Sequence, residues 1–105
     1  MTEKTTRIRQ KKMKQQGGRC FYCSRMMWTS TGESDSRKRK PHPLMQCTTE
    51  HLKPRSEGGA DSERNIVAAC LYCNQTRHKG KRPLDAAAYK SKVQKRLSAG
   101  RWLRL

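Results

Sequence analysis

The chain has 105 residues, enough for one small domain, and only 32% of them are hydrophobic and 6% aromatic, so a core this thin usually needs a staple. Its formal net charge of +17 favours a polyanionic partner, nucleic acid first and an anionic membrane second. No apolar run approaches the roughly 20 residues that span a bilayer, and the N-terminus lacks a signal-peptide core, so we expect a cytoplasmic protein without membrane contact.

The charge is unevenly distributed along the chain. Residues 44–76 carry three basic and four acidic side chains, a net of −1, which leaves +18 for the rest. A nearly neutral centre between basic arms favours a chemical site held against DNA or RNA by its surroundings. The alternative is a basic surface that is merely solvated.

The first predicted elements are a helix and a loop. Residues 2–16 contain helix formers and are followed by Gly17 and Gly18, which predicts that the helix stops there. Only two of its residues are apolar, so it should bury little. Residues 29–43 are rich in Ser, Gly and Pro and include four consecutive basic residues, which predicts a loop.

Two short strands are expected in the centre of the chain. One lies within residues 44–52, and the second, short and buried, covers residues 65–69. The segment between them, KPRSEGGADSER, consists of turn-forming residues. A helix is expected to follow from Cys70 to about Lys79.

A last helix is predicted near the C-terminus. Asp85 can cap its start, and Gly100 can end it. Tyr89, Val93 and Leu97 have the spacing i, i+4, i+8, which places them on one face that should dock on the domain.

Four of the five cysteines form two pairs, Cys20-x-x-Cys23 and Cys70-x-x-Cys73. Zn²⁺ takes four thiolates in a tetrahedron, and each CxxC turn places two sulfurs near one ion. Thiols stay reduced in the cytosol, so the pairs favour a structural zinc over disulfides or a redox CxxC. The remaining Cys47 is expected to be a small buried hydrophobe.

Four motifs in order carry a family resemblance: CFYC, TTEHLKPRSEGG, NIVAACLYCN and the later KRP. Together they resemble the zinc-knuckle branch of the HNH endonuclease family, over about residues 17–83. The resemblance implies a small α+β fold, in which a ββα-metal (HNH) domain is stapled by a structural four-cysteine zinc and flanked by basic helices. We expect a basic N-terminal arm at 1–19, the nuclease domain at 20–80 with a loop insertion at 29–43, and a basic C-terminal helix and tail at 81–105.

The chemistry of phosphodiester hydrolysis agrees with this resemblance. The reaction needs a base that deprotonates water and a cation that holds the developing charge. Histidine suits the base because its ordinary pKa of about 6.5 lies near working pH. Neighbouring residues on a strand point to opposite faces, so Glu50 and His51 can share a cleft only if the strand ends or twists there.

The resemblance implies a role for each of four residues. His51 matches the general base, and Asn65 matches the residue that ties down the long loop and helps orient that base. Glu50 and Asn74 match the two ligands of the catalytic metal. Two protein ligands leave room for waters and phosphate oxygens, which suits Mg²⁺ or Mn²⁺.

His78 lies four residues after Asn74, so both can share a helix face. It is either an extra metal ligand, a phosphate contact, or a polar residue in the last helical turn, and we favour the last. The basic residues expected to contact DNA are Arg37, Lys38, Arg39, Lys40, Lys53, Arg55, Arg77, Lys79, Lys81 and Arg82.

We therefore expect a metal-dependent endonuclease that nicks DNA or cleaves both strands, with a structural zinc and a catalytic Mg²⁺ or Mn²⁺. Two alternatives stay open. One is a zinc-stabilised nucleic-acid-binding module without catalysis, against which the presence of both Glu50 and His51 argues. The other is an accessory subunit of a larger phage or restriction nuclease assembly.

Overall fold

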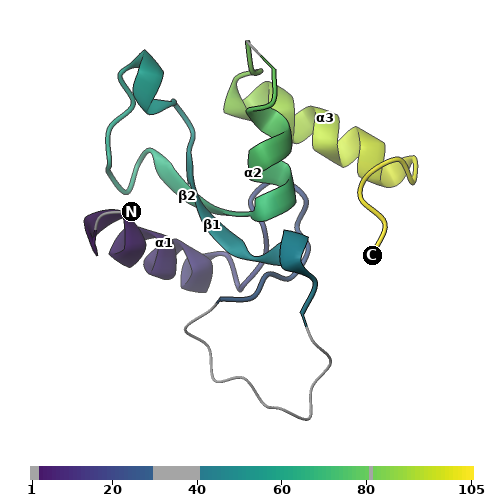
Figure 1. The fold of residues 1–105 in the computed structure, drawn as a ribbon, viewed down its shortest axis with the longest axis horizontal. Coiled ribbons are helices and arrows are strands. Elements are labelled where there is room, and N and C mark those ends of the chain that lie inside the picture. Colours follow the sequence, from purple (N-terminus) through teal and green to yellow (C-terminus); the bar gives the residue numbers. More distant parts are fainter. Residues whose placement is uncertain (1–2, 30–40, 81) are drawn as a thin grey trace.

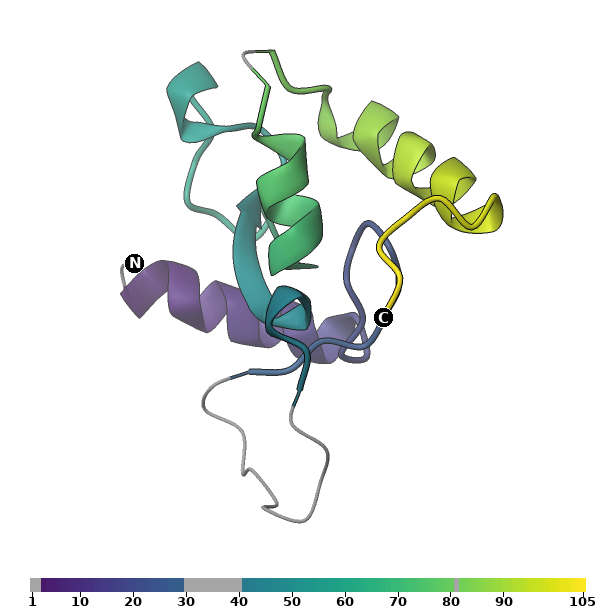
Figure 2. The same ribbon diagram turned by 45° about the vertical axis from the view of Figure 1, so that its right-hand side comes forward.

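The structure is a computed structural model that describes residues 3–29, 41–80 and 82–105. It is a small α+β fold in which a two-stranded antiparallel sheet is combined with three α-helices (Figures 1 and 2). Along the chain, α2 follows directly from β2, and α3 lies next to α2 on the side away from α1. None of the helices in these residues has the length and apolar character needed to cross a membrane.

The helix predicted at the N-terminus is α1, Glu3–Gln15. Gly17 and Gly18 follow it with φ of +64° and +79°, a left-handed conformation that glycine adopts without a Cβ clash, so the helix stops there. It buries more than its composition suggests, because Thr5 is buried together with Ile8 and the helix packs against both strands.

The strands β1, Cys47–His51, and β2, Ile66–Cys70, lie within one residue of the predicted segments. They pair with Cys47 opposite Cys70 and Glu50 opposite Val67. All five residues of β2 are buried, as expected for a short apolar run with no polar face. The sheet therefore brings the second cysteine pair to one end of β1 and leaves His51 at the other end.

Helix α2, Leu71–Arg77, is shorter than the predicted helix from Cys70 to about Lys79. At its start, Cys70 has extended backbone and belongs to β2, and its sulfur caps the helix by accepting the N–H of Cys73. At its end, His78 has already left helical geometry, with φ of −96° and ψ of 9°.

Helix α3, Ala86–Ser98, confirms the predicted C-terminal helix. Asp85 caps it by accepting the N–H of Ala88, and Gly100 follows its end with φ of +69°. Tyr89 and Val93 are buried, and Leu97 packs against the core from its edge. The apolar stripe does dock on the domain.

The core is built around the cysteine pairs. The rings of Tyr22 and Tyr89 meet edge to face with centroids 4.8 Å apart, and Tyr89 also lies edge-on to Trp102. Cys47 is buried in the same cluster, as expected for a small hydrophobe, and burial raises the pKa of its thiol. The core therefore depends on sulfur and aromatic groups, with few aliphatic side chains.

Candidate active site and metal centre

The sulfurs of the two cysteine pairs converge in the core. All four cysteines are buried, and their Sγ atoms lie within 4.8 Å of one another. The Sγ atoms of Cys23 and Cys70 are 3.9 Å apart. A tetrahedral ion with Zn–S bonds of about 2.3 Å places its sulfurs about 3.8 Å apart, so the cluster has the size of a four-thiolate zinc site.

The protonation of the cluster also favours a cation. Backbone N–H groups of Tyr22 and Cys70 donate to the sulfur of Cys20 at 3.4 and 3.3 Å. Hydrogen bonds with Cys23, Cys70 and Cys73 lower the pKa of the Cys20 thiol. The contacts with Cys20 and then Cys23 raise the pKa of both Cys70 and Cys73. One thiolate in this buried cluster thus opposes the ionisation of others, and four thiolates need a metal ion to compensate their charge.

Glu50 and His51 line one cavity despite being neighbours on β1. Its volume is about 290 Å³, and it is also lined by Thr5, Thr49, Pro54, Arg55, Asn74 and His78. His51 is the last residue of the strand, so the alternation of the strand no longer constrains where its ring lies. Because β1 ends at His51, Glu50 and His51 can both line the same cavity.

The imidazole of His51 is held by a residue that the sequence did not single out. Its Nε2 lies 2.7 Å from Oδ1 of Asp61. Arg55 donates to both oxygens of Asp61 at 3.0 Å. The bonds to His51 and then Arg55 lower the pKa of Asp61, so this carboxylate stays charged and holds one ring nitrogen. Within the described residues, His51 Nδ1 has no hydrogen bond, which leaves it available to a molecule in the cavity.

Asn65 ties down the loop between the strands. Its Oδ1 accepts the N–H of Lys53 at 2.8 Å, and its Nδ2 donates to the carbonyls of Lys53 and Ala60, each at 2.9 Å. Gly59 packs so tightly here that a Cβ would lie 1.7 Å from the Lys53 carbonyl oxygen, so another residue would displace the backbone. Asn65 thereby closes the loop that carries Asp61, and it has no hydrogen bond to the His51 ring among the described contacts.

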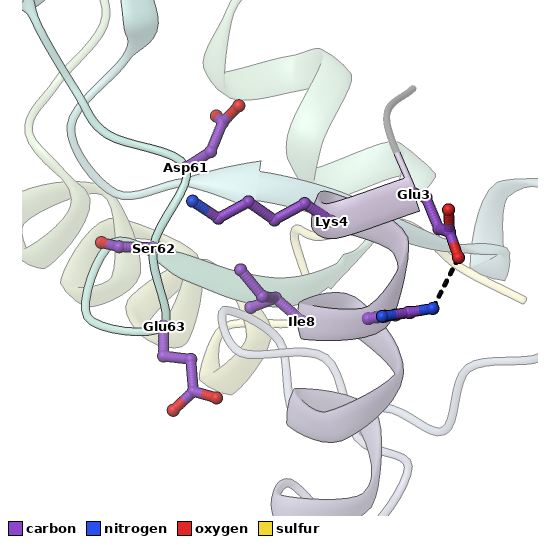
Figure 3. Close-up of a pocket in the computed structure, with 7 residues that line it drawn as sticks. Glu3, Lys4, Ile8, Asp61, Ser62 and Glu63 are labelled. Carbon is purple, nitrogen blue, oxygen red and sulfur yellow. Dashed lines mark hydrogen bonds and ion pairs between the residues drawn. The ribbon is translucent and has the colours of Figure 1, made fainter.

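A second hollow, about 620 Å³, separates this loop from α1 (Figure 3). Lys4 reaches across it from α1 toward the segment that carries Asp61 and Ser62. Farther along α1, the Lys11 ammonium forms an ion pair with the Glu63 carboxylate at 2.7 Å. The first helix is therefore part of the structure that surrounds the site, and it also contributes Thr5 to the wall of the cavity.

Glu50 is almost completely buried, with 2% of its surface exposed. Its Oε2 accepts hydrogen bonds from the Tyr22 hydroxyl at 3.0 Å and from Arg77 Nη1 at 3.1 Å. Its Oε1 lies 3.0 Å from Nε2 of His78. Burial and the charge of Glu50 raise the pKa of Tyr22, so its hydroxyl remains a donor to the carboxylate.

Arg77 differs from the expectation that it contacts DNA. Its side chain is 1% exposed, and its guanidinium binds the Glu50 carboxylate together with the carbonyls of His51, Leu52 and Leu84. A buried carboxylate needs a paired cation, and Arg77 meets that need inside the domain.

Asn74 and His78 both reach the cavity from α2 and its C-terminus. The Asn74 amide nitrogen donates to Thr48 Oγ1 and to the Thr49 carbonyl, each at 3.0 Å. Its Oδ1 has no hydrogen bond among the described residues and is a candidate ligand oxygen. His78 does lie at the helix end, as favoured, but its ring also contacts Glu50 at the cavity wall.

The other predicted DNA contacts divide into two groups. Lys53, Arg55, Lys79 and Arg82 are exposed. Arg55 lines the cavity, and Arg82 lines an adjoining hollow together with Pro54 and His78. The remaining five lie outside the described residues: Arg37, Lys38, Arg39, Lys40 and Lys81.

Sequence reasoning missed Asp61 and Tyr22 and misplaced Arg77. Asp61 lies in a turn-rich loop, where an acidic residue is ordinary and carries no periodic signal. Tyr22 lies inside the first cysteine pair, and its position there was the one signal that could have marked it.

A comparison with protein families agrees with this arrangement. Residues 30–80 match the family model described as HNH endonuclease. The four-cysteine cluster fits the zinc-binding branch of that family. No curated protein and no solved structure matches the chain significantly.

Proposed function

Because residues 30–80 match the family model described as HNH endonuclease, we propose that this protein is a metal-dependent endonuclease that hydrolyses phosphodiester bonds of DNA. One observation favours catalysis over nucleic-acid binding alone. An imidazole held at one nitrogen by a carboxylate lies in the same cavity as the Glu50 carboxylate and the Asn74 amide.

His51 is the general base in this proposal. Its Nε2 is bonded to the charged Asp61, which supports the tautomer that carries the proton on Nε2. Nδ1 then accepts the proton of the attacking water, and Asp61 stabilises the imidazolium that forms. Asn65 acts at a distance, by holding the loop that positions Asp61.

The catalytic cation would be held by Glu50 and Asn74, with His78 as a third candidate. A carboxylate offers about four lone-pair positions, and the three contacts to Glu50 leave one for a metal. An oxygen-rich donor set suits Mg²⁺ or Mn²⁺. When bound, the ion supplies a Lewis acid for the phosphate and the leaving oxygen.

DNA binding is supported by the charge of +17 and by the position of the exposed basic residues. Lys53 and Lys79 are exposed and directly adjoin, along the chain, the cavity-lining residues Pro54 and His78, and the exposed Arg82 lines the adjoining hollow, so all three are candidates for phosphate contacts. Contacts of this kind position a strand without reading its sequence, so we expect cleavage with little sequence preference.

One observation favours the alternative of a zinc-stabilised binding module without catalysis. Arg77 already neutralises Glu50, which lowers the need of that carboxylate for a metal ion. The two functions differ in whether a divalent cation turns DNA binding into DNA cleavage.

Plasmid nicking separates the two functions. Supercoiled plasmid is incubated with the purified chain in Mg²⁺, in Mn²⁺ and in EDTA, and open-circular product is measured. We expect product only with the metals, and a loss of about 10²–10⁴-fold in His51→Ala, the effect typical of losing a general base.

His42→Ala is the matched control, because His42 caps a short 3₁₀ turn at Pro43–Met45 and does not line the cavity. It should cleave like the wild type. Undiminished cleavage by His51→Ala would reject His51 as the base, and retention of DNA binding without any cleavage would favour the binding module.

A further inference from the structure

A residue inside the first cysteine pair and a residue just after the second pair hold the carboxylate of Glu50. Tyr22 lies between the two cysteines of the first pair, and its hydroxyl donates to Oε2 at 3.0 Å. Arg77 lies four residues after Cys73 on α2, and it donates to the same oxygen at 3.1 Å and to the Tyr22 hydroxyl at 3.2 Å. The metal-binding cysteines and the active-site carboxylate are thus joined through two side chains.

The two oxygens of Glu50 have different surroundings. Oε2 receives both buried donors, Tyr22 and Arg77, whose side chains have no appreciable exposure. Among the described residues, Oε1 has a hydrogen-bond contact only with His78, whose side chain is 34% exposed and lines the cavity. Oε2 is therefore the anchored oxygen, and Oε1 is the oxygen on the side of the cavity.

Tyr22 cannot move independently of the cysteine cluster. Its backbone N–H donates to the sulfur of Cys20 at 3.4 Å, and its carbonyl accepts the side-chain amide of Gln94 on α3. Its ring is packed edge to face against Phe21 and Tyr89. The hydroxyl is thereby fixed relative to the sulfurs, and through it so is Glu50 Oε2.

We propose that Tyr22 is a positioning residue that anchors Glu50 Oε2 to the cysteine cluster and thereby sets how tightly the active site holds its divalent cation. The inference rests on the proposed function, in which Glu50 is a ligand of that cation. A carboxylate held at one oxygen presents the other in a single orientation, whereas a carboxylate free to rotate must be ordered by the metal itself. Partners that orient a ligand in this way typically contribute about 10–100-fold to metal affinity or activity.

The test compares two buried tyrosines. Tyr22→Phe removes the hydroxyl that contacts Glu50, and Tyr89→Phe removes a hydroxyl that donates to the Cys73 carbonyl at 2.7 Å. Both tyrosines are buried in the same aromatic cluster, and both variants keep the ring and its packing. Tyr22→Phe loses the hydrogen bond to Glu50 and the one that Arg77 donates to the hydroxyl, and Tyr89→Phe loses its bond to the Cys73 carbonyl. Only Tyr22→Phe therefore removes a contact of Glu50.

The experiment measures the affinity of the full zinc-loaded chain for Mn²⁺. The concentration of free Mn²⁺ is determined by electron paramagnetic resonance during the titration. We expect Tyr22→Phe to bind Mn²⁺ about 10–100-fold more weakly than the wild type, and Tyr89→Phe to bind it like the wild type. In plasmid nicking, the Mn²⁺ concentration for half-maximal rate should rise by the same factor in Tyr22→Phe, while KM for DNA stays unchanged. Zinc content and melting temperature verify that both variants are folded.

Equal Mn²⁺ affinity in the wild type and Tyr22→Phe would overturn the inference, even if the wild type cleaves DNA. Equal weakening in both tyrosine variants would also overturn it, because the effect would then belong to any buried hydroxyl in the cluster. A wild type that binds Mn²⁺ with the expected dependence on Tyr22 but leaves the plasmid intact would overturn the proposed function and not this inference.

Discussion

Glu50 and His51 are neighbours on one strand, yet two very different regions hold them. Glu50 is held by the cysteine-pair region, through Tyr22 and Arg77, whose side chains are buried. His51 is held by the loop between the strands, through Asp61, whose side chain is 30% exposed.

The difference matters because burial decides how strong a charge contact is. The pair between Arg77 and Glu50 is 1% and 3% exposed, so salt screens it little and loss of one partner leaves a bare charge in the core. The pair between Arg55 and Asp61 is 57% and 30% exposed, so water and salt screen it. We therefore expect the first region to contribute more to folding stability, and the second to orient the His51 ring within the folded domain.

The largest effect is expected from the cysteine cluster itself. Cys73→Ser should leave the domain unfolded, because a structural zinc contributes folding free energy that this thin core cannot replace. Cys47→Ser is the control, since Cys47 is buried but lies outside the four-cysteine cluster. Circular dichroism should show folded Cys47→Ser, and elemental analysis should find one zinc per chain in it and in the wild type. Folded wild-type protein without zinc would contradict the prediction.

A smaller loss is expected when the buried ion pair is broken. Arg77→Met should destabilise the domain by about 3–5 kcal/mol, because it leaves the Glu50 carboxylate buried without its cation. Arg55→Met removes the same kind of side chain from the exposed pair and should change stability little. Urea unfolding of both variants compares the two regions directly. Equal shifts of the two urea midpoints would mean that burial does not explain a difference in stability contribution between the two regions.

Asp61→Asn should affect catalysis without unfolding the domain. The amide cannot stabilise the imidazolium of His51 as a carboxylate does, so kcat should fall by less than the roughly 10²–10⁴-fold expected for loss of the base itself. Glu63→Gln is the control, because Glu63 lies on the same loop but pairs with Lys11 on α1. Plasmid nicking at saturating Mn²⁺ measures both variants, and a wild-type kcat in Asp61→Asn would remove Asp61 from the mechanism.

The smallest effect is expected from the exposed basic residues around the site. Replacing Lys53, Lys79 and Arg82 with serine should make the dependence of log K on log salt shallower, by about 0.9 for each phosphate contact that is lost. The control replaces three exposed basic residues of α3 that do not line the cavity, Lys92, Lys95 and Arg96. DNA binding is measured by fluorescence anisotropy across a range of salt. Equal changes of slope in the two triple variants would mean that binding is not concentrated at the cavity.

Much of the fold could be predicted because its signals are local. Gly17 and Gly18 end α1 by adopting positive φ, and Asp85 begins α3 by accepting a backbone N–H three residues later. The spacing within each CxxC pair likewise requires only a turn to bring two sulfurs together. Such features depend on a few consecutive residues, so the amino-acid sequence alone determined the end of α1, both ends of α3, the approximate positions of the strands and the turn within each CxxC pair.

The partners of Glu50 and His51 were decided only by the tertiary structure. Tyr22 and Arg77 lie 28 and 27 residues from Glu50 along the chain, and Asp61 lies 10 residues from His51 across a loop. No local pattern distinguishes such an arginine from one that faces solvent, which is why Arg77 was assigned to DNA. Its role follows from the buried Glu50 carboxylate beside it. Burial is a property of the packed domain, because it depends on which segments, distant in the sequence, exclude water from that carboxylate.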